Sequence, residues 1–186
     1  MMKTRALALS ALLATSAFAG AAFAQENPMV GGAPMSPEMN IVENAVNSAD
    51  HTTLVAAVEA AGLVETLQGE GPFTVFAPTN DAFAALPEGT VDTLLLPENL
   101  EMLQQVLTCH VVGANVTSTD LVGMIEADGG THTIETLGGC MLEATLDGDS
   151  VVITDENGTA ATVTIADVIQ SNGVIHVTDA VFTPAM

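Results

Sequence analysis

The residues of this sequence that could take part in catalysis do not assemble into a recognisable active site. Nucleophilic hydrolysis needs a nucleophile, a general base and a group that orients the base, but the chain has only 4 histidines and no Gly-x-Ser-x-Gly turn. Its only bases are Lys3 and Arg5, so Schiff-base chemistry and an arginine clamp for anionic substrates have no candidates beyond them. We expect a protein that is not an enzyme and that uses no cofactor.

Carboxylates are the most numerous groups that could bind a ligand, and the ligand they suit is a hard divalent cation. Oxygen donors gather in Asp147-Gly148-Asp149 and in Asp155-Glu156-Asn157. Neither segment has EF-hand spacing, and both are also expected to form hairpin turns. We therefore expect no specific metal site and only a loose, weak association of divalent cations.

The chain begins with the pattern of a cleaved export signal. Met1 to Arg5 is a short basic segment, residues 6–19 are apolar, and Ala22-Phe23-Ala24 provides an Ala-x-Ala cleavage site. This pattern predicts a signal peptide over residues 1–24 and a periplasmic or secreted, extracellular product. The apolar run is too short for a transmembrane segment, and no other stretch is long and apolar enough to be one.

Charge narrows the range of partners further. The formal net charge is −21, with 23 acids against 2 bases, and both bases lie in the predicted signal peptide. So acidic a surface repels phosphate, which excludes nucleic acid as a partner, and it also repels anionic lipid head groups. The chain has no Trp and no Tyr and only 6 Phe, so it lacks most aromatic platforms for bases, sugars and quaternary amines.

The cysteines, Cys109 and Cys140, are compatible with two buried thiols or with one disulfide. The oxidising compartment that export implies favours the disulfide. In the chain-entropy model, closing the loop between them would stabilise the fold by roughly 3.5 kcal/mol.

The remaining sequence predicts a short tail followed by one domain. Residues 25–39 are rich in Pro, Gly and Met without periodicity, which indicates a flexible N-terminal tail. The domain over 40–186 has helical spacing of apolar residues in its first half. Its second half has alternating patterns separated by the hairpin signals Asp147-Gly148 and Asn157-Gly158. Helices followed by hairpins indicate an α+β fold. We expect helices within 41–46, 50–61, 63–67, 79–86, 97–107 and 120–127, and strands within 73–76, 109–112, 131–137, 141–146, 151–154, 160–165, 174–178 and 180–183.

Three segments, taken in order, resemble the motifs of fasciclin-like (FAS1) domains. FTVFAPTNDAF at 73–83 is similar to the first signature of that family, and SNGVIHVTDAVF at 171–182 is similar to the second. Between them, VLTCHVV at 106–112 resembles the family's tyrosine-histidine motif. The chain is thereby identified as a single-domain, bacterial-type member from about residue 40 to residue 184.

The resemblance implies a fold and a function. The fold is a β-sandwich or wedge of about seven strands flanked by several helices. The function is that of a secreted or periplasmic adhesion or protein–protein interaction module, whose partner is a cell-surface or matrix protein. An alternative of another class is an acidic periplasmic protein that binds calcium or a small ligand, using an apolar groove between helices and sheet.

The resemblance also implies partner-binding residues, because two regions of animal relatives are linked to integrin binding. Carried over residue by residue, the tyrosine-histidine motif and an Asp-Ile motif before the second signature supply Leu107, His110, Val111, Val112, Asp167 and Val168. Cys109 stands where the family usually has Tyr, which favours a disulfide to Cys140 as a local staple. Val168 stands where the second motif usually has Ile.

The other residues of these motifs are expected to hold the fold. His110 and His176 lie in apolar segments predicted as strands, so we expect buried, neutral imidazoles with hydrogen-bonded nitrogens. Asp167 is the best functional candidate among the acids, because it adjoins a hydrophobic residue near a strand end. Turn, cap or hydrogen-bond acceptor roles are expected for Thr79, Asn80, Asp81 and Asp179.

Overall fold

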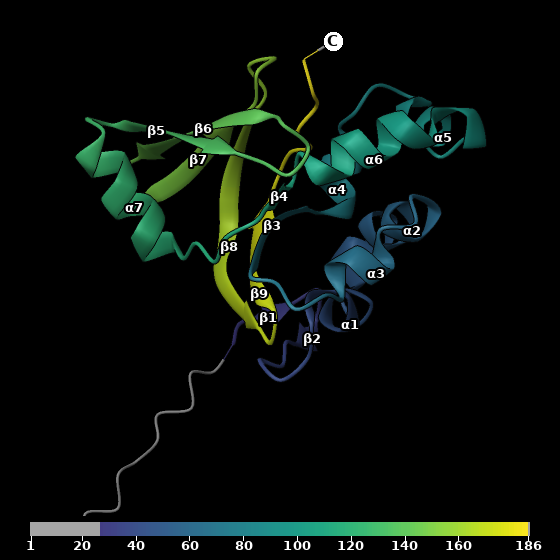
Figure 1. The fold of residues 1–186 in the computed structure, drawn as a ribbon, viewed down its shortest axis with the longest axis horizontal. Helices are drawn as coiled ribbons and strands as arrows, with labels where there is room; N and C mark the ends of the chain where they lie inside the picture. Colours follow the sequence, from purple (N-terminus) through teal and green to yellow (C-terminus); the bar gives the residue numbers. More distant parts are fainter. Residues whose placement is uncertain (1–26, 186) are drawn as a thin grey trace, which may run out of the picture.

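One seven-stranded sheet runs through the domain in the order β4-β3-β9-β8-β7-β6-β5 (Figure 1). The computed structural model describes residues 27–185, so the predicted signal peptide lies outside the described residues. A separate two-stranded sheet pairs β1 with β2. The strands are β1 (Met29–Val30), β2 (Ala33–Pro34), β3 (Phe73–Pro78), β4 (Val111–Val112), β5 (Thr131–Glu135), β6 (Met141–Asp147), β7 (Ser150–Thr154), β8 (Ala160–Gln170) and β9 (Gly173–Thr178).

The long strand β8 joins the two halves of the sheet. It pairs antiparallel with β7 at one end and with β9 along its length, and its register against β9 shifts twice between Val163 and Val168. These irregularities bend the strand, and Figure 1 shows β5, β6 and β7 running across the direction of β8 and β9. The only parallel pair in the seven-stranded sheet is β3 with β9. The expected α+β fold, a wedge of seven strands flanked by helices, is confirmed.

Most helices precede the hairpins in the chain, and α1, α4 and α7 start at polar side-chain caps. Asn40 and Glu43 form a capping box at α1, the Thr79 hydroxyl accepts a hydrogen bond from the Ala82 backbone N–H at α4, and Thr117 and Asp120 form a second box at α7. No helix within residues 27–185 has the length and apolar character needed to cross a bilayer. The helices are α1 (Ile41–Ala45), α2 (Thr52–Ala60), α3 (Val64–Leu67), α4 (Asn80–Ala84), α5 (Thr90–Leu94), α6 (Leu100–Thr108) and α7 (Ser118–Ala127), with 3₁₀ turns η1 (Ala49–His51) and η2 (Pro97–Asn99).

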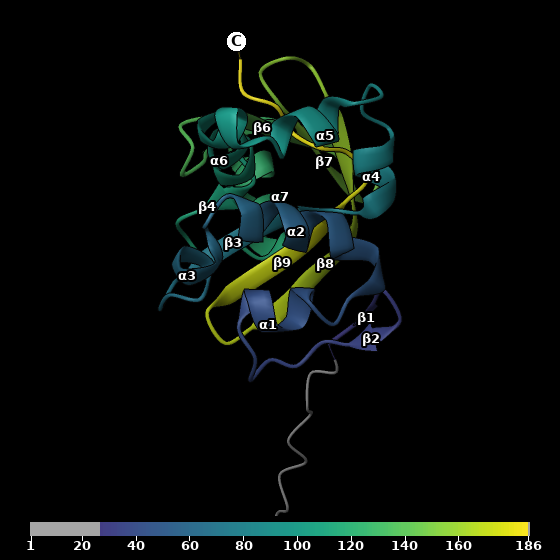
Figure 2. The ribbon, with the colours of Figure 1, turned by 90° about the vertical axis from the view of Figure 1, so that its right-hand side faces the viewer.

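The domain has two apolar cores, one on each side of the bend. Side chains of α1, α2, α3, α4 and α6 pack with β3, β9 and the C-terminal part of β8 in the larger core, and Figure 2 shows α1 and α2 in front of β9. The smaller core lies between α7 and the strands β5, β6 and β7, with Leu121 and Ile125 of the helix fully buried. Phe76 and Phe182 belong to the smaller core and stack with the histidines described below.

The prediction of a flexible tail over residues 25–39 does not hold for residues 27–39, which pack against the domain as an N-terminal strap. Gly31 and Gly32, both with positive φ, form the two-residue turn between β1 and β2. Val30 and Met35 enter the larger core. The Asn27 side chain pairs with both backbone groups of Ile169 in β8. Composition suggested a tail because the strap has only two core residues. The contacts that hold the strap are made with residues distant in the sequence, so a local pattern does not show them.

Several element boundaries differ from the predicted ones. The helix expected at 50–61 is η1 followed by α2, and the helix expected at 120–127 starts earlier, at Ser118. The expected strand at 109–112 shortens to β4, because Cys109 ends α6 and His110 lies in the turn that follows. Residues 180–183 form no strand. In the segment 180–183, the backbone N–H groups of Phe182 and Thr183 bind the side chains of His110 and Asp155 in place of a neighbouring strand.

Gly173 tests the parallel pairing of β3 with β9. It pairs with Phe73, and a Cβ at this position would overlap the Phe73 carbonyl. We expect Gly173→Ala to lower the free energy of unfolding by about 2 kcal/mol or more, because the strands would have to separate. Denaturant titration followed by circular dichroism measures the change.

Gly123 provides the matched control, because it lies within α7 and a Cβ there would meet nothing within 4 Å. Gly123→Ala should raise the free energy of unfolding by about 0.5–1 kcal/mol through the better helix propensity of alanine. Equal stability of the two variants would show that β3 and β9 do not approach as closely as the structure has them.

Candidate functional site

The predicted partner-binding residues are mostly buried. The side chains of Leu107, His110, Val111, Val112 and Val168 are at most 7% exposed. Leu107 lies on the inner face of α6, and Val111 and Val112 pair with Val75 and Thr74 of β3. A partner that binds the domain in this conformation therefore cannot contact these five residues as a protruding surface.

His110 joins α6 to the C-terminal segment. Its Nδ1 donates to the Val106 carbonyl at 2.8 Å, and its Nε2 accepts from the Phe182 backbone N–H at 2.9 Å. Its ring also stacks on the Phe182 ring, with centroids 4.9 Å apart. Burial lowers the pKa of His110 to about 4, against the raising effect of the Val106 hydrogen bond. Both nitrogens are used internally, so this neutral imidazole has none left for a ligand.

His176 and Asp167 join β9 and β8 to the start of α7. The His176 Nε2 donates to the Val116 carbonyl at 2.8 Å, and its Nδ1 faces the Asp167 backbone N–H at 3.4 Å. Asp167 has φ +56°, and its carboxylate accepts hydrogen bonds from the backbone N–H and the hydroxyl of Ser118. The Asp167 carboxylate thus binds the first turn of α7, where the helix dipole favours a negative charge. Burial lowers the pKa of His176.

Two of the remaining signature residues, Asn80 and Asp179, make hydrogen bonds to other elements. Asn80 accepts from the backbone N–H of Thr53 at 3.0 Å and donates to the Ala49 carbonyl at 2.8 Å. Asp179 accepts from the Thr162 backbone N–H at 2.6 Å. Thr79 caps α4, and Asp81 lies exposed in the first turn of that helix. These contacts connect α4, η1 and β8 to the ends of β3 and β9.

The carboxylate of Asp155, one of those considered as calcium ligands, accepts hydrogen bonds from backbone N–H groups. It is 5% exposed and accepts from the backbone N–H groups of Asn157, Thr159 and Thr183 at 3.0, 2.8 and 2.9 Å. It therefore closes the β7–β8 turn and fastens the C-terminal segment. Within residues 27–185, no three His, Cys, Asp or Glu side chains are grouped so that they could hold a metal ion.

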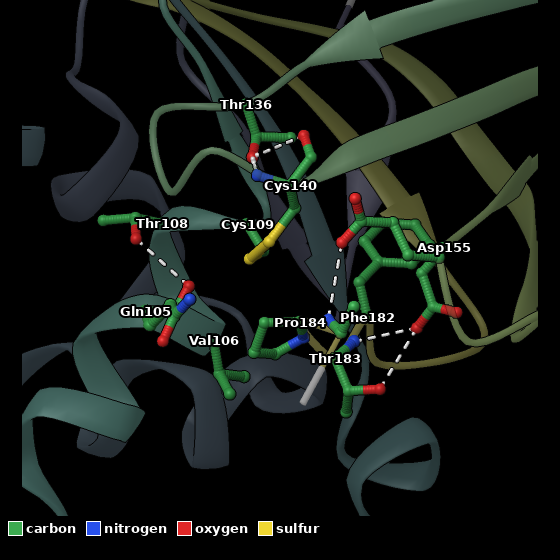
Figure 3. Close-up of a disulfide and its surroundings, with 12 residues drawn as sticks. Gln105, Val106, Thr108, Cys109, Thr136, Cys140, Asp155, Phe182, Thr183 and Pro184 are labelled. Carbon is green, nitrogen blue, oxygen red and sulfur yellow. Dashed lines mark hydrogen bonds between the residues drawn. A yellow bond between two sulfur atoms is a disulfide. The ribbon is translucent and has the colours of Figure 1, made fainter.

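A disulfide between Cys109 and Cys140 joins the end of α6 to the β5–β6 loop (Figure 3). The same loop is held by two backbone hydrogen bonds, from Leu137 N–H to the Val111 carbonyl at 2.8 Å and from Gly138 N–H to the Thr108 carbonyl at 3.1 Å. Together these links attach a loop of the smaller core to a helix of the larger one. They leave the Leu137 side chain 52% exposed beside the end of α6.

An open apolar groove lies next to this loop. Its lining comes from α1, α2, α3, β3, α6 and β4 and from Leu137, and it holds about 680 Å³ of empty space including its open mouth. Leu107, His110 and Val111 form part of the lining, so three of the predicted binding residues contribute to this site. Val112, Asp167 and Val168 do not line it. The sequence did not identify Val42, Val55, Val64 and Leu137 as lining residues, although the first three lie in segments whose apolar spacing predicts helices.

The groove has few free polar groups. The nitrogens of His110 are used as described, and the Thr108 hydroxyl donates to the Gln104 carbonyl at 2.7 Å. Val42, Val55 and Val64 are half-buried at its edge. A site of this kind favours an apolar group over a sugar or another hydrogen-bonding ligand.

Comparison with known proteins finds a matching family model, similar protein sequences and a solved structure of the same fold. A model of the fasciclin domain matches residues 49–184. Protein sll1483 of Synechocystis is 46% identical over 162 residues, which cover 87% of this chain and 83% of that protein. Immunogenic protein MPB70 of Mycobacterium bovis is 34% identical over 145 residues, which cover 75% of this chain and 66% of that protein. A solved FAS1 domain pair from the insect cell adhesion molecule fasciclin I has a TM-score of 0.69 at 17% identity, over 80% of this chain and 51% of that one.

The buried histidines predict that acid destabilises the domain. Burial lowers the pKa values of His51, His110 and His176, so the unfolded chain takes up protons near pH 6.5, before the folded chain does. Their stabilising contribution is complete above about pH 6.5. It is lost as the pH falls towards the pKa values of the histidines in the folded protein, about 4 for His110. For His110 alone, we expect a loss of about 3 kcal/mol across this window, measured by urea unfolding at a series of pH values.

The variant His110→Gln isolates the contribution of His110 to the acid destabilisation. Since His110→Gln removes one titrating group, the free energy of unfolding of this variant should fall less steeply with acid, by up to about 1.4 kcal/mol per pH unit. The contribution of His110 is the difference between the pH dependences of the two proteins, because both contain the same carboxylates. Parallel curves would contradict a buried, neutral His110.

The disulfide should be present in the isolated protein and should contribute measurably to its stability. The unreduced, denatured protein should have no free thiol in an Ellman-type assay, since both cysteines form the bond. Reduction should lower the free energy of unfolding by roughly 3.5 kcal/mol, the chain-entropy value for a loop of this length. The double variant Cys109→Ser/Cys140→Ser should match the reduced protein, and two free thiols in the untreated sample would contradict the bond.

Proposed function

The chain belongs to the fasciclin-domain family, and from this we propose that it is an exported adhesion or protein–protein interaction module that binds a cell-surface or matrix protein. The solved structure of the same fold comes from a protein named as a cell adhesion molecule. Export is supported by the signal-peptide pattern at residues 1–24 and by the Cys109–Cys140 disulfide, a bond of oxidising compartments.

The observation that carries the proposal is the open apolar groove. Partly exposed aliphatic side chains on its edge, among them Val55, Val64 and Leu137, would leave water when a partner covers them. The tyrosine-histidine motif supports this placement, because Leu107, His110 and Val111 form part of the groove lining. In this proposal the motif shapes the binding site from beneath, and the residues at the groove edge make the contact.

Binding is also favoured over catalysis by the roles of the histidines. His51 is 3% exposed and contacts the Ser48 hydroxyl through Nδ1 at 2.8 Å. The ring nitrogens of His110 and His176 all face backbone groups. A general base needs a free nitrogen within reach of a substrate, and these three imidazoles use theirs to join parts of the fold.

A coated-surface experiment tests the proposed function. A surface coated with the purified exported protein should retain cells better than an inert coating, and part of this retention should persist at high salt, because salt screens charges but leaves apolar burial in place. Retention no better than on the inert coating would contradict the proposed function.

Two double variants test whether the groove is the surface used. Val55→Gln/Val64→Gln makes its edge polar and should reduce partner affinity by about tenfold, equivalent to about 1.4 kcal/mol of lost apolar burial. Leu96→Gln/Leu100→Gln changes two leucines that are 43% and 38% exposed and lie outside the groove, so it should leave retention unchanged. Equal effects of the two variants would show that the groove is not the binding surface.

A further inference from the structure

The groove has an acidic edge as well as an apolar floor, and together these define a class of partner. Glu59 of α2 is one of the lining residues, and Glu65 of α3 adjoins the lining residues Val64 and Thr66 in the sequence without itself lining the groove. Both glutamates are exposed. Neither carboxylate has a hydrogen-bond or ion-pair partner within residues 27–185.

The rest of the protein offers these carboxylates no counter-charge. Lys3 and Arg5 are the only bases in the sequence, and both lie in the predicted signal peptide. The one ion pair in the described part of the chain joins His132 to Asp128, away from the groove lining. Residues 27–185 contain no Lys or Arg, so a partner is the source of any such side chain that pairs with Glu59 or Glu65 in the described part of the chain.

The groove also limits which part of a partner can enter it. It presents aliphatic side chains, and its buried His110 and half-buried Thr108 already have hydrogen-bond partners. An anionic ligand would lose its hydration without meeting an opposite charge in return. An apolar group that enters the groove meets no such penalty.

Resting on the proposed function, we propose that the groove binds a cationic amphipathic segment of a protein partner, whose apolar side chains enter between α1, α2, α3 and α6 while flanking Lys or Arg residues pair with Glu59 and Glu65. Apolar side chains at helical spacing are a common way of filling a groove between helices. The high negative charge of the domain speeds the approach of such a segment and repels an acidic one.

The test uses three labelled peptides and fluorescence anisotropy at physiological salt. The first carries Leu on one helical face and Lys on the other, the second has the same composition in scrambled order, and the third has Glu in place of Lys. We expect the first to bind at least about tenfold more tightly than the scrambled peptide, and the third not to bind. Equal binding of the first two would reduce the interaction to general charge attraction and overturn the proposal.

Matched variants separate the apolar and charged contributions. Val55→Gln/Val64→Gln should remove the preference for the amphipathic peptide over the scrambled one. Glu59→Gln/Glu65→Gln should weaken binding about threefold, whereas Glu98→Gln/Glu101→Gln, with the same change in net charge at exposed positions outside the groove, should weaken it less. Equal effects of the two glutamate pairs would overturn the assignment of the cations to the groove edge.

If the groove binds a small apolar molecule or a second copy of the chain, the binding experiments give different results. Binding of the uncharged dye N-phenyl-1-naphthylamine that the amphipathic peptide does not displace would assign the groove to a small apolar molecule. Dimerisation that Val55→Gln/Val64→Gln abolishes would assign it to a second copy of the chain. Either result would overturn the inference, while the retention of cells tests the broader function separately. Circular dichroism of each variant confirms that its fold is intact.

Discussion

The fold depends on keeping two imidazoles buried, neutral and hydrogen-bonded at both nitrogens. His110 holds the end of α6 to the C-terminal segment through Val106 and Phe182, and His176 holds β9 to the start of α7 through Val116. Both rings stack with phenylalanines of the smaller core, His176 with Phe76 and His110 with Phe182. A charge on either ring would have to be buried at this junction, so protonation of the rings weakens the contacts that they make there.

A second constraint follows from the lack of bases. With 23 acids and both bases in the predicted signal peptide, the domain offsets its self-repulsion by apolar burial, backbone hydrogen bonds and one disulfide. Carboxylates that lie partly or fully buried bind backbone N–H groups, as Asp155 and Asp167 do. Residues 27–185 contain no lysine or arginine, which is why the proposed partner supplies the bases that pair with the carboxylates beside the groove.

Much of the fold could be predicted, but the candidate site only in part. Thr79 as a cap and the buried His110 and His176 followed from local patterns and motifs, because caps and apolar segments are encoded by neighbouring residues. The strap over 27–39 and the role of Asp167 did not, because each depends on a partner far along the chain, Ile169 for Asn27 and Ser118 for Asp167. Leu137 gave no periodic signal, since a loop carries it to the groove.

By itself, the sequence determined the composition of the surface, the order of helices and hairpins, and membership of the family, because charge, periodicity and contiguous motifs are properties of the chain. The tertiary structure alone decided which motif residues are available to a partner. It turned the Asp167 carboxylate onto α7, placed the tyrosine-histidine motif beneath a groove, and set Glu59, Val64 and Leu137 around its mouth. The physical reason is that burial and proximity depend on how α1, α2, α3, α6 and the β5–β6 loop pack, and no local pattern contains that packing.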